Sequence, residues 1–167
     1  MPQPMHKAIT TLVAVVYLAL IMNGYIDHPD QIPGEVDEWD LQCLAGAMMI
    51  ENGYNTEECV FLTGAVVLNR LHSDNWKGDT IEEIILAKGQ YAQVTRNGFR
   101  TKEATNRVKA IAKYLLLYYE PGFQVPEDVV YQSQRVLGHG KYIDGKLVHE
   151  YRRIPVPGQK DEIFCYE

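Results

Sequence analysis

The sequence predicts a mainly helical α+β fold, in which a helical body comes first and a small antiparallel β region follows toward the C-terminus. Apolar residues recur at helical spacing between residues 41 and 119. From residue 129 onward, short β-branched and aromatic runs are separated by turn signals instead. A chain of 167 residues is long enough for one domain with a real core and short for two. This segregation of helices and strands is typical of an α+β layout.

The N-terminal segment differs from the rest of the chain. An apolar run over residues 8–22 follows His6 and Lys7 and precedes an acidic stretch. Positive charge before the run and negative charge after it is typical of a chain whose N-terminus stays in the cytoplasm while the rest is exported. A helix of that length spans roughly 22 Å, short of a hydrocarbon core of roughly 30 Å, and this favours a signal peptide over a permanent span. No A-x-A cleavage site follows, so an uncleaved membrane anchor and a buried helix of the domain stay open. We expect residues 1–38 to be this segment with its linker, and residues 39–167 to be the folded domain.

The periodicity predicts the following helices in order: residues 41–52, 56–71, 80–87 and 101–119. Asp40 is the expected N-cap of the first helix, and Asn55 with Glu58 has capping-box spacing at the second. Gly64 lies in the buried stripe of the second helix, where a missing side chain permits close approach of a neighbouring helix.

The third helix has its own start and stop signals. Thr80 and Glu83 form its expected capping box, and Lys88 with Gly89 is expected to end it. The stretch over residues 89–94 has no helical period and reads as extended.

Strand signals begin after the last helix. Residues 129–133 predict a strand, and residues 142–148 predict a hairpin with a type I′ turn at Asp144-Gly145. Residues 163–166 predict a final strand.

Charge and cysteine content exclude several classes of function. The net charge is -6 and no Lys/Arg cluster interrupts it, so nucleic acid is not an expected partner. Cys43, Cys59 and Cys165 form no CxxC pair and have no Cys/His ligand spacing, so a structural zinc site is not expected. No other metal or cofactor motif is found in the sequence, and none is expected. Cys43 and Cys59 lie on neighbouring predicted helices and could form a disulfide, or all three are small buried thiols.

Glu51 is the candidate catalytic residue on position alone. It lies seven residues after Leu44 and three after Met48, so it continues the apolar face up to Gly53, where the helix stops. Partial burial and the negative helix C-terminus both raise the pKa of a carboxyl group. A carboxylic acid that stays protonated near neutral pH can act as a general acid. The alternative is an ordinary exposed residue at a helix end.

Three blocks in residues 44–94 resemble the spore-cortex-lytic and cell wall hydrolase family (SleB-type, hydrolase-2 domain). Residues 47–53 (AMMIENG) resemble the helix end that carries the family's catalytic glutamate. Residues 64–71 (GAVVLNRL) resemble its "GAVxLNRV" helix. Residues 80–85 (TIEEII) and 89–94 (GQYAQV) are similar to its "TIxxVI" and "GQFxxV". The later strands resemble the family more loosely.

The match departs from the family at the catalytic helix end. The family usually has Glu-Ala-Arg-Gly-Glu, whereas this chain has Glu51-Asn52-Gly53-Tyr54-Asn55. The first glutamate is kept and the second acid is not. Glu57 and Glu58 are the nearest acids that could replace it.

The resemblance implies a lysozyme-like, lytic-transglycosylase-like helical body that acts on peptidoglycan glycan strands. Two-carboxylate glycosidases need a second acid, and the matched motifs contain none. A lytic transglycosylase needs one acid, which is Glu51 here. Sugar-binding candidates are the amides and phenols of Gln90, Tyr91 and Gln93 before the fourth helix, and of Tyr131 and Gln132 on the first predicted strand.

The resemblance also implies an exported or membrane-anchored monomer that faces the cell wall and is attached through its N-terminal segment where that segment is kept. Two alternatives stay open at this point. One is a muramidase that uses water, and the other is a non-catalytic peptidoglycan-binding module that does not need Glu51.

Overall fold

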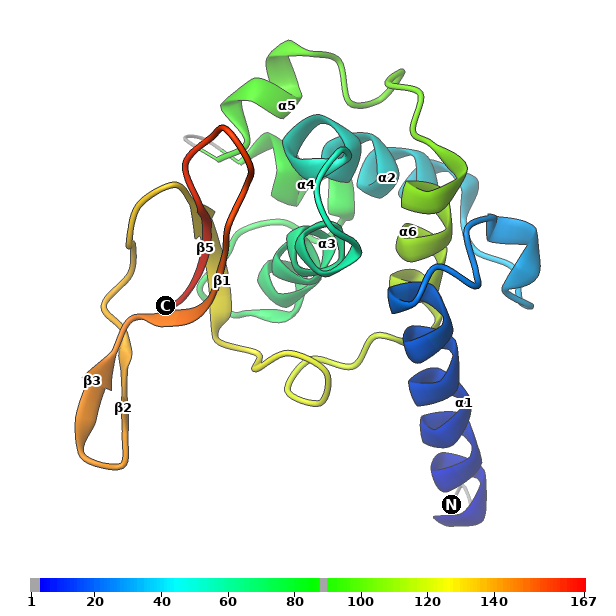
Figure 1. The fold of residues 1–167 in the computed structure, drawn as a ribbon, viewed down its shortest axis with the longest axis horizontal. Coiled ribbons are helices and arrows are strands. Elements are labelled where there is room, and N and C mark those ends of the chain that lie inside the picture. The colour runs from blue at the N-terminus through cyan, green and yellow to red at the C-terminus, as the bar shows by residue number, and fades with distance from the viewer. Residues whose placement is uncertain (1–3, 88–89) are drawn as a thin grey trace.

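The computed structural model describes residues 4–87 and 90–167 and has the α+β layout that the sequence predicts (Figure 1). In chain order the helical elements are α1 (Pro4–Met22), the 3-10 turn η1 (Pro29–Gln31), α2 (Glu38–Asn52), α3 (Glu57–His72), α4 (Ile81–Leu86), α5 (Ala92–Arg96) and α6 (Asn106–Tyr118). The strands are β1 (Val129–Ser133), β2 (Lys141–Ile143), β3 (Lys146–Val148), β4 (Glu150–Ile154) and β5 (Glu162–Tyr166).

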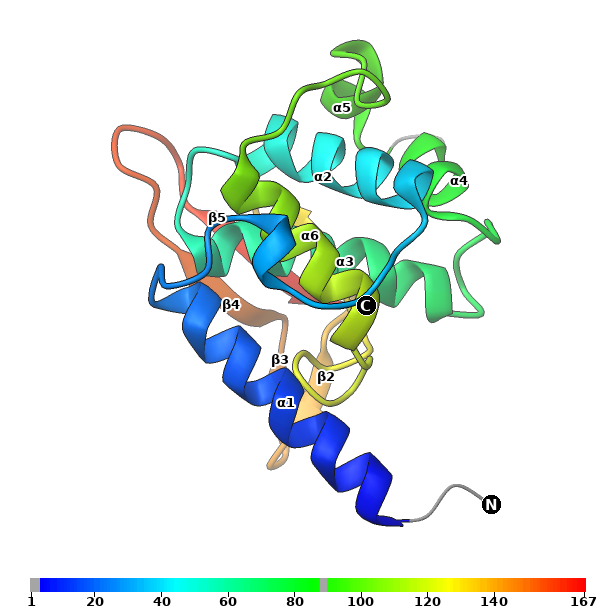
Figure 2. The same cartoon turned by 90° about the vertical axis from the view of Figure 1, so that its right-hand side faces the viewer.

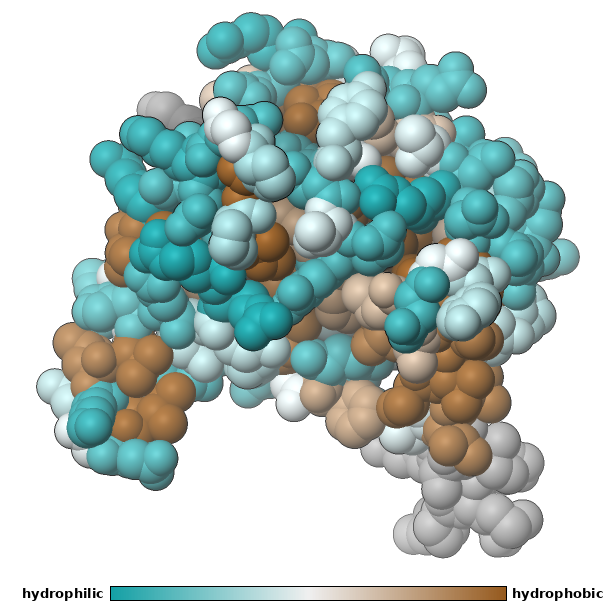
Figure 3. All heavy atoms as spheres, in the orientation of Figure 1, coloured by the Kyte–Doolittle hydropathy of each residue, from teal (hydrophilic) through white to brown (hydrophobic). Residues whose placement is uncertain are grey.

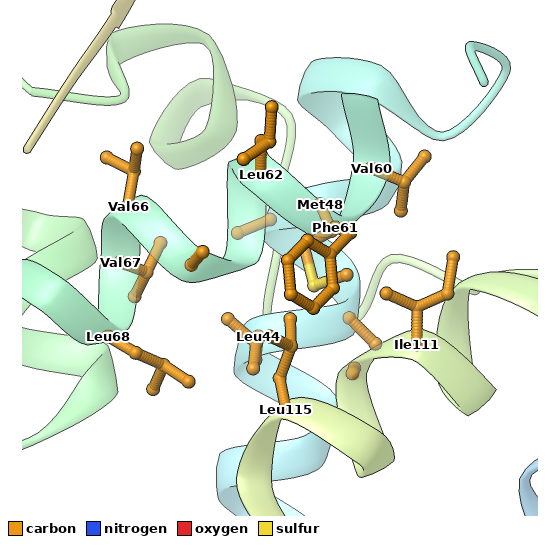
Figure 4. Packing of buried hydrophobic residues seen from close by; sticks show 14 of the residues in the cluster. Leu44, Met48, Val60, Phe61, Leu62, Val66, Val67, Leu68, Ile111 and Leu115 are labelled. Carbon is orange, nitrogen blue, oxygen red and sulfur yellow. The ribbon is translucent and has the colours of Figure 1, made fainter. Parts of the chain in front are cut away.

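The core lies between α2, α3 and α6. Every residue of α3 from Cys59 to Arg70 is buried, so this helix is surrounded by the rest of the domain. Figure 4 shows Met48 of α2, Phe61 of α3 and Leu115 of α6 pointing toward one another. A Cβ atom added at Gly64 would fall 2.9 Å from the Met48 sulfur, and closer still to Leu115. The expected close helix approach at Gly64 is therefore confirmed.

The helix starts follow N-cap chemistry, although two of the predicted boundaries are wrong. α2 begins three residues earlier than predicted because Asp37, not Asp40, accepts hydrogen bonds from the first free N–H groups. α6 begins at Asn106, since Thr105 caps it. Thr80 caps α4 as predicted, with the Glu83 N–H donating to its hydroxyl at 3.2 Å.

The start of α3 is also capped differently from the prediction. The Thr56 hydroxyl accepts from the Cys59 N–H, so Thr56 is the N-cap and not Asn55.

The predicted extended stretch over residues 89–94 is wrong in its second half. Residues from Ala92 onward form the short helix α5, in which the Thr95 N–H donates to the Tyr91 carbonyl oxygen at 2.9 Å. A five-residue helix is too short to show a helical period, and the buried Val94 anchors it to the core. α4 ends at Leu86, and the expected stop at Lys88 and Gly89 lies outside the described residues.

The C-terminal strands form a three-stranded antiparallel sheet in the order β1-β5-β4, with β5 in the middle. The hairpin of β2 and β3 projects beside it (Figure 1), and its turn residues Asp144 and Gly145 have φ of 50° and 75°. Two positive φ angles in succession confirm the type I′ turn. β4 was not predicted from the sequence. The end of β1 pairs with the start of β5, with Gln132 opposite Phe164.

The N-terminal helix packs against α6. Ala14 and Ile21 are buried, and the Tyr114 hydroxyl donates to the Ala14 carbonyl oxygen at 3.0 Å. Tyr17 stacks on Tyr118 at a centroid distance of 5.8 Å. Figure 2 shows the beginning of α1 extending beyond the body. In Figure 3, hydrophobic surface gathers on α1 and on the β2–β3 hairpin. Within the described part of the chain, no helix combines the length and the apolar character that crossing a membrane requires.

The cysteines do not form a disulfide. Cys43, Cys59 and Cys165 are all free and buried. Of the two alternatives that the sequence left open, the structure has the small buried thiols.

Candidate active site

A cavity of about 540 Å³ opens where the helical body meets the sheet. Its walls come from the end of α2 and the turn after it, from the segment around α5, and from the ends of β1 and β5. These segments are far apart in the sequence, and the pairing of β1 with β5 brings the walls from these two strands together. Polar side chains predominate on the walls, which is unlike an ordinary hydrophobic crevice.

Glu51 lies on the wall formed by α2, near the end of that helix. Glu51 is half-buried, and both Met48 on the same helix and the adjacent Asn52 are buried. Burial is the main cause that raises the pKa of Glu51, and the negative charge of Glu162 adds to it, while the Arg70 cation opposes both. Glu51 therefore keeps its proton at higher pH than an exposed glutamate does.

The turn after Glu51 is fixed by Gly53 and by an arginine from α6. A Cβ atom at Gly53 would fall 2.7 Å from the Met49 carbonyl oxygen, so the chain can turn this tightly only at a glycine. Arg107 donates to the Gly53 carbonyl oxygen at 2.7 Å and pairs with Glu57 at 2.7 Å. The end of α2 is thereby held in place, and Glu51 with it.

The two acids that could have replaced the family's second carboxylate are occupied elsewhere. Glu57 is paired with Arg107, and this ion pair lowers the pKa of Glu57 although burial opposes it. Glu58 pairs with Arg152 at 2.6 Å. Neither side chain lines the cavity.

Four of the five predicted sugar-binding residues line the same cavity as Glu51: Gln90, Tyr91, Gln93 and Gln132. Tyr131 does not. Adjacent side chains on a strand point to opposite faces, and Tyr131 packs edge-on against Trp76 at a centroid distance of 5.9 Å. The structure therefore brings the predicted amides to one place and leaves Tyr131 apart from them.

Tyr91 has an unusual backbone and a buried side chain. Its φ is 44°, in the left-handed region that non-glycine residues rarely adopt. Burial raises the pKa of its hydroxyl. No partner for this hydroxyl exists among the described residues. Strained backbone of this kind is concentrated at functional sites, and here it belongs to a residue of the cavity wall.

Arg70 both braces the fold and lines the cavity. Only 3% of the residue is exposed, and its Nε donates to the Val130 carbonyl oxygen at 2.7 Å. The guanidinium group lies over the Trp76 ring at 4.2 Å and over the Tyr91 ring at 4.9 Å. Its Nη1 has no partner among residues 4–87 and 90–167. The Nε bond makes Arg70 a brace between α3 and β1, and the same residue lines the cavity.

Glu162 is a cavity residue that the sequence reasoning missed. It is the first residue of β5 and shares the cavity with Glu51. The Nε2 groups of Gln132 and Gln134 donate to its two carboxylate oxygens at 3.4 and 3.5 Å. In the sequence Glu162 stands just before the predicted strand over residues 163–166, where a charged residue is ordinary. No local spacing connects it with α2.

The described residues contain no convergent group of three or more His, Cys, Asp or Glu side chains suited to a metal ion. Comparison of the chain with protein-family models, curated proteins and solved structures finds no match. The resemblance to cell wall hydrolases therefore rests on the three sequence blocks alone.

Proposed function

We propose that this protein cleaves peptidoglycan glycan strands between N-acetylmuramic acid and N-acetylglucosamine, as a lytic transglycosylase with Glu51 as its single acid and base. The observation that carries the proposal is the position of Glu51, half-buried in a polar cavity that holds its pKa above the ordinary value. The three ordered sequence blocks supply the substrate class. A lysozyme-like relationship of the helical body is part of the same proposal.

The walls of the cavity suit a sugar ligand. Amide groups such as those of Gln90, Gln93 and Gln132 both donate and accept hydrogen bonds, as sugar hydroxyls and acetamido groups do. The cavity also has the volume of a small-molecule site, for which about 300–1,000 Å³ is usual.

The reaction proceeds in two proton transfers. Glu51 first donates its proton to the glycosidic oxygen, and the bond between this oxygen and the muramic anomeric carbon breaks, with its electron pair leaving on the oxygen. The muramic C6 hydroxyl then attacks the anomeric carbon, and the Glu51 carboxylate takes up its proton. The products are an N-acetylglucosamine end and a 1,6-anhydro ring, with no net change at Glu51.

The test is digestion of purified peptidoglycan with product analysis by mass spectrometry. We expect anhydro-muramic ends from the wild-type chain and no products from Glu51→Gln. The control is Glu38→Gln, which makes the same chemical change at the exposed start of α2 and should leave cleavage intact.

Three results would contradict the proposal. Reducing muramic ends would replace the transglycosylase by a muramidase. Pelleting with cell walls without any products would replace it by a binding module. Full activity of Glu51→Gln would remove Glu51 from the mechanism.

A further inference from the structure

Two carboxylates face the same cavity from different parts of the fold. Glu51 comes from the helical side at the end of α2, and Glu162 comes from the sheet side at the start of β5. The two are close enough for the charge of Glu162 to raise the pKa of Glu51. Because like charges repel, the negative charge of Glu162 makes ionisation of Glu51 less favourable.

Two glutamine amides contact the carboxylate of Glu162. Both of its oxygens accept amide hydrogen bonds, from Gln132 and Gln134, and hydrogen bonds to a carboxylate stabilise its charge. Burial raises the pKa of Glu51, so Glu51 holds its proton at higher pH than an exposed glutamate does. The division of roles follows from environment, since the two side chains are chemically identical.

A second and independent feature indicates that this cavity accepts a polar ligand. Only 3% of Arg70 is exposed, yet its Nη1 has no hydrogen-bond partner in the described part of the chain. A buried guanidinium donor without an acceptor is costly in a finished protein core. It is satisfied when a bound molecule supplies an oxygen acceptor within the cavity that Arg70 lines.

We propose that Glu162 is a second catalytic carboxylate, which faces the sugar ring as an anion and stabilises the positive charge that develops at the anomeric carbon. This inference rests on the proposed glycan cleavage. When Glu51 protonates the leaving oxygen and the bond to it breaks, the ring becomes oxocarbenium-like. A negative charge held in place beside the ring lowers the energy of that state without reorganising. Glu162 neither gives nor takes a proton in this step, and the C6 hydroxyl still closes the ring.

The charge of Glu162 has a second measurable consequence. Activity requires protonated Glu51, so the rate falls as the pH rises through the pKa of Glu51. Glu162→Gln removes one of the causes that raise this pKa. The alkaline limb of the pH profile should therefore move to lower pH in this variant. This shift reports the charge of Glu162 at Glu51, and the loss in kcat reports the effect of the same charge on the sugar ring.

The experiment compares Glu162→Gln with Asp161→Asn on soluble peptidoglycan fragments, with kcat and KM measured across the pH range. Asp161 is the neighbouring acid, lies outside the cavity and contacts Arg153 at 3.5 Å, so its variant matches the change in net charge. For Glu162→Gln we expect a loss in kcat on the order of 100-fold, the cost of removing one preorganised electrostatic group. KM should change little, and the alkaline limb should shift to lower pH. Asp161→Asn should behave as the wild type.

A third variant separates charge from folding. Glu162→Asp keeps the negative charge, so the wild-type position of the alkaline limb should return in it even where kcat stays low. Wild-type kcat in Glu162→Gln would overturn the inference, whatever the position of the alkaline limb. The inference would also fail if the wild type releases reducing muramic ends and Glu162→Gln does not, because that result would assign Glu162 to the activation of water.

Failure of the inference is distinguishable from failure of the proposed function. If the wild-type chain releases no glycan products, the proposed function fails and the catalytic role of Glu162 fails with it. If Glu51→Gln is inactive while Glu162→Gln is fully active, only the role of Glu162 fails. NMR titration of the Glu51 carboxyl carbon reads the coupling of the two carboxylates without any substrate, and an unchanged Glu51 pKa in Glu162→Gln would refute that coupling.

Discussion

Gly64→Ala tests the close packing of α3 against α2 and α6. A Cβ atom at this position would lie 2.9 Å from the Met48 sulfur and closer to Leu115, and both side chains are at most 1% exposed. Carbon atoms pack best at about 3.5–4.0 Å, so these neighbours must withdraw by at least about 0.6 Å into a filled core. Overpacking of this kind costs about 1–3 kcal/mol.

A gain in helix propensity offsets part of this cost. Replacing glycine by alanine inside a helix is worth about 1 kcal/mol. With an overpacking cost in the middle of its range, the net loss in the free energy of unfolding is about 1 kcal/mol. For a chain of this size that lowers Tm by about 2–4 °C. Urea denaturation followed by circular dichroism at 222 nm measures the free energy, and a thermal scan measures Tm.

The reasoning also predicts what happens when the obstructing side chain is removed. In a Leu115→Ala background the added methyl group has space on that side, so Gly64→Ala should stabilise the protein there instead of destabilising it. A Gly64→Ala protein that is more stable than the wild type would refute the packing argument. So would the same loss of stability in both backgrounds, because the double-mutant cycle would then show no coupling.

Three further predictions concern the site and its support. Glu51→Gln should have a higher Tm than the wild type at pH 7 and the same Tm at pH 4. The raised pKa of Glu51 means that the native state binds more protons than the unfolded state above pH 4.5, so the wild type loses stability as the pH rises through that window. An equal Tm difference at both pH values would contradict this. The native protein should react slowly with a thiol reagent at pH 8 and quickly in urea, because burial raises the pKa of Cys43 to about 11 and that of Cys59 to about 12; fast labelling of the native chain would contradict their burial. Tyr114→Phe should lower the free energy of unfolding by about 1 kcal/mol, since it removes the hydrogen bond to the Ala14 carbonyl oxygen, and an unchanged value in urea denaturation would indicate that α1 does not dock on α6 in solution.

The helices and most strands were predictable because their signals are local. The buried stripe of α6 and the cap at Thr80 follow from spacing within one element. Asp144-Gly145 fixed the hairpin turn because these residues tolerate positive φ. The start of α2 was missed because Asp37 and Asp40 are both good N-caps, and the choice between them depends on how the preceding turn packs. α5 was missed because it is shorter than the window over which a period can be seen.

Glu51 shows how far the candidate site could be predicted. Its place on the inward face at the end of α2 follows from helical spacing, which is a property of the local chain. Its protonation depends on burial and on Glu162, and these arise only when β5 pairs with β1. The same pairing directs Gln132 into the cavity and Tyr131 away from it.

The sequence by itself determined the order and type of the main elements and indicated the candidate acid. These depend on neighbours within a few residues, where periodicity, capping and turn chemistry operate, whereas the amides were candidates through the resemblance to cell wall hydrolases. Only the tertiary structure decided that Glu162 and Arg70 join Glu51 in one cavity. That arrangement depends on contacts between segments distant in the chain, and no local spacing encodes which side chains such contacts bring together.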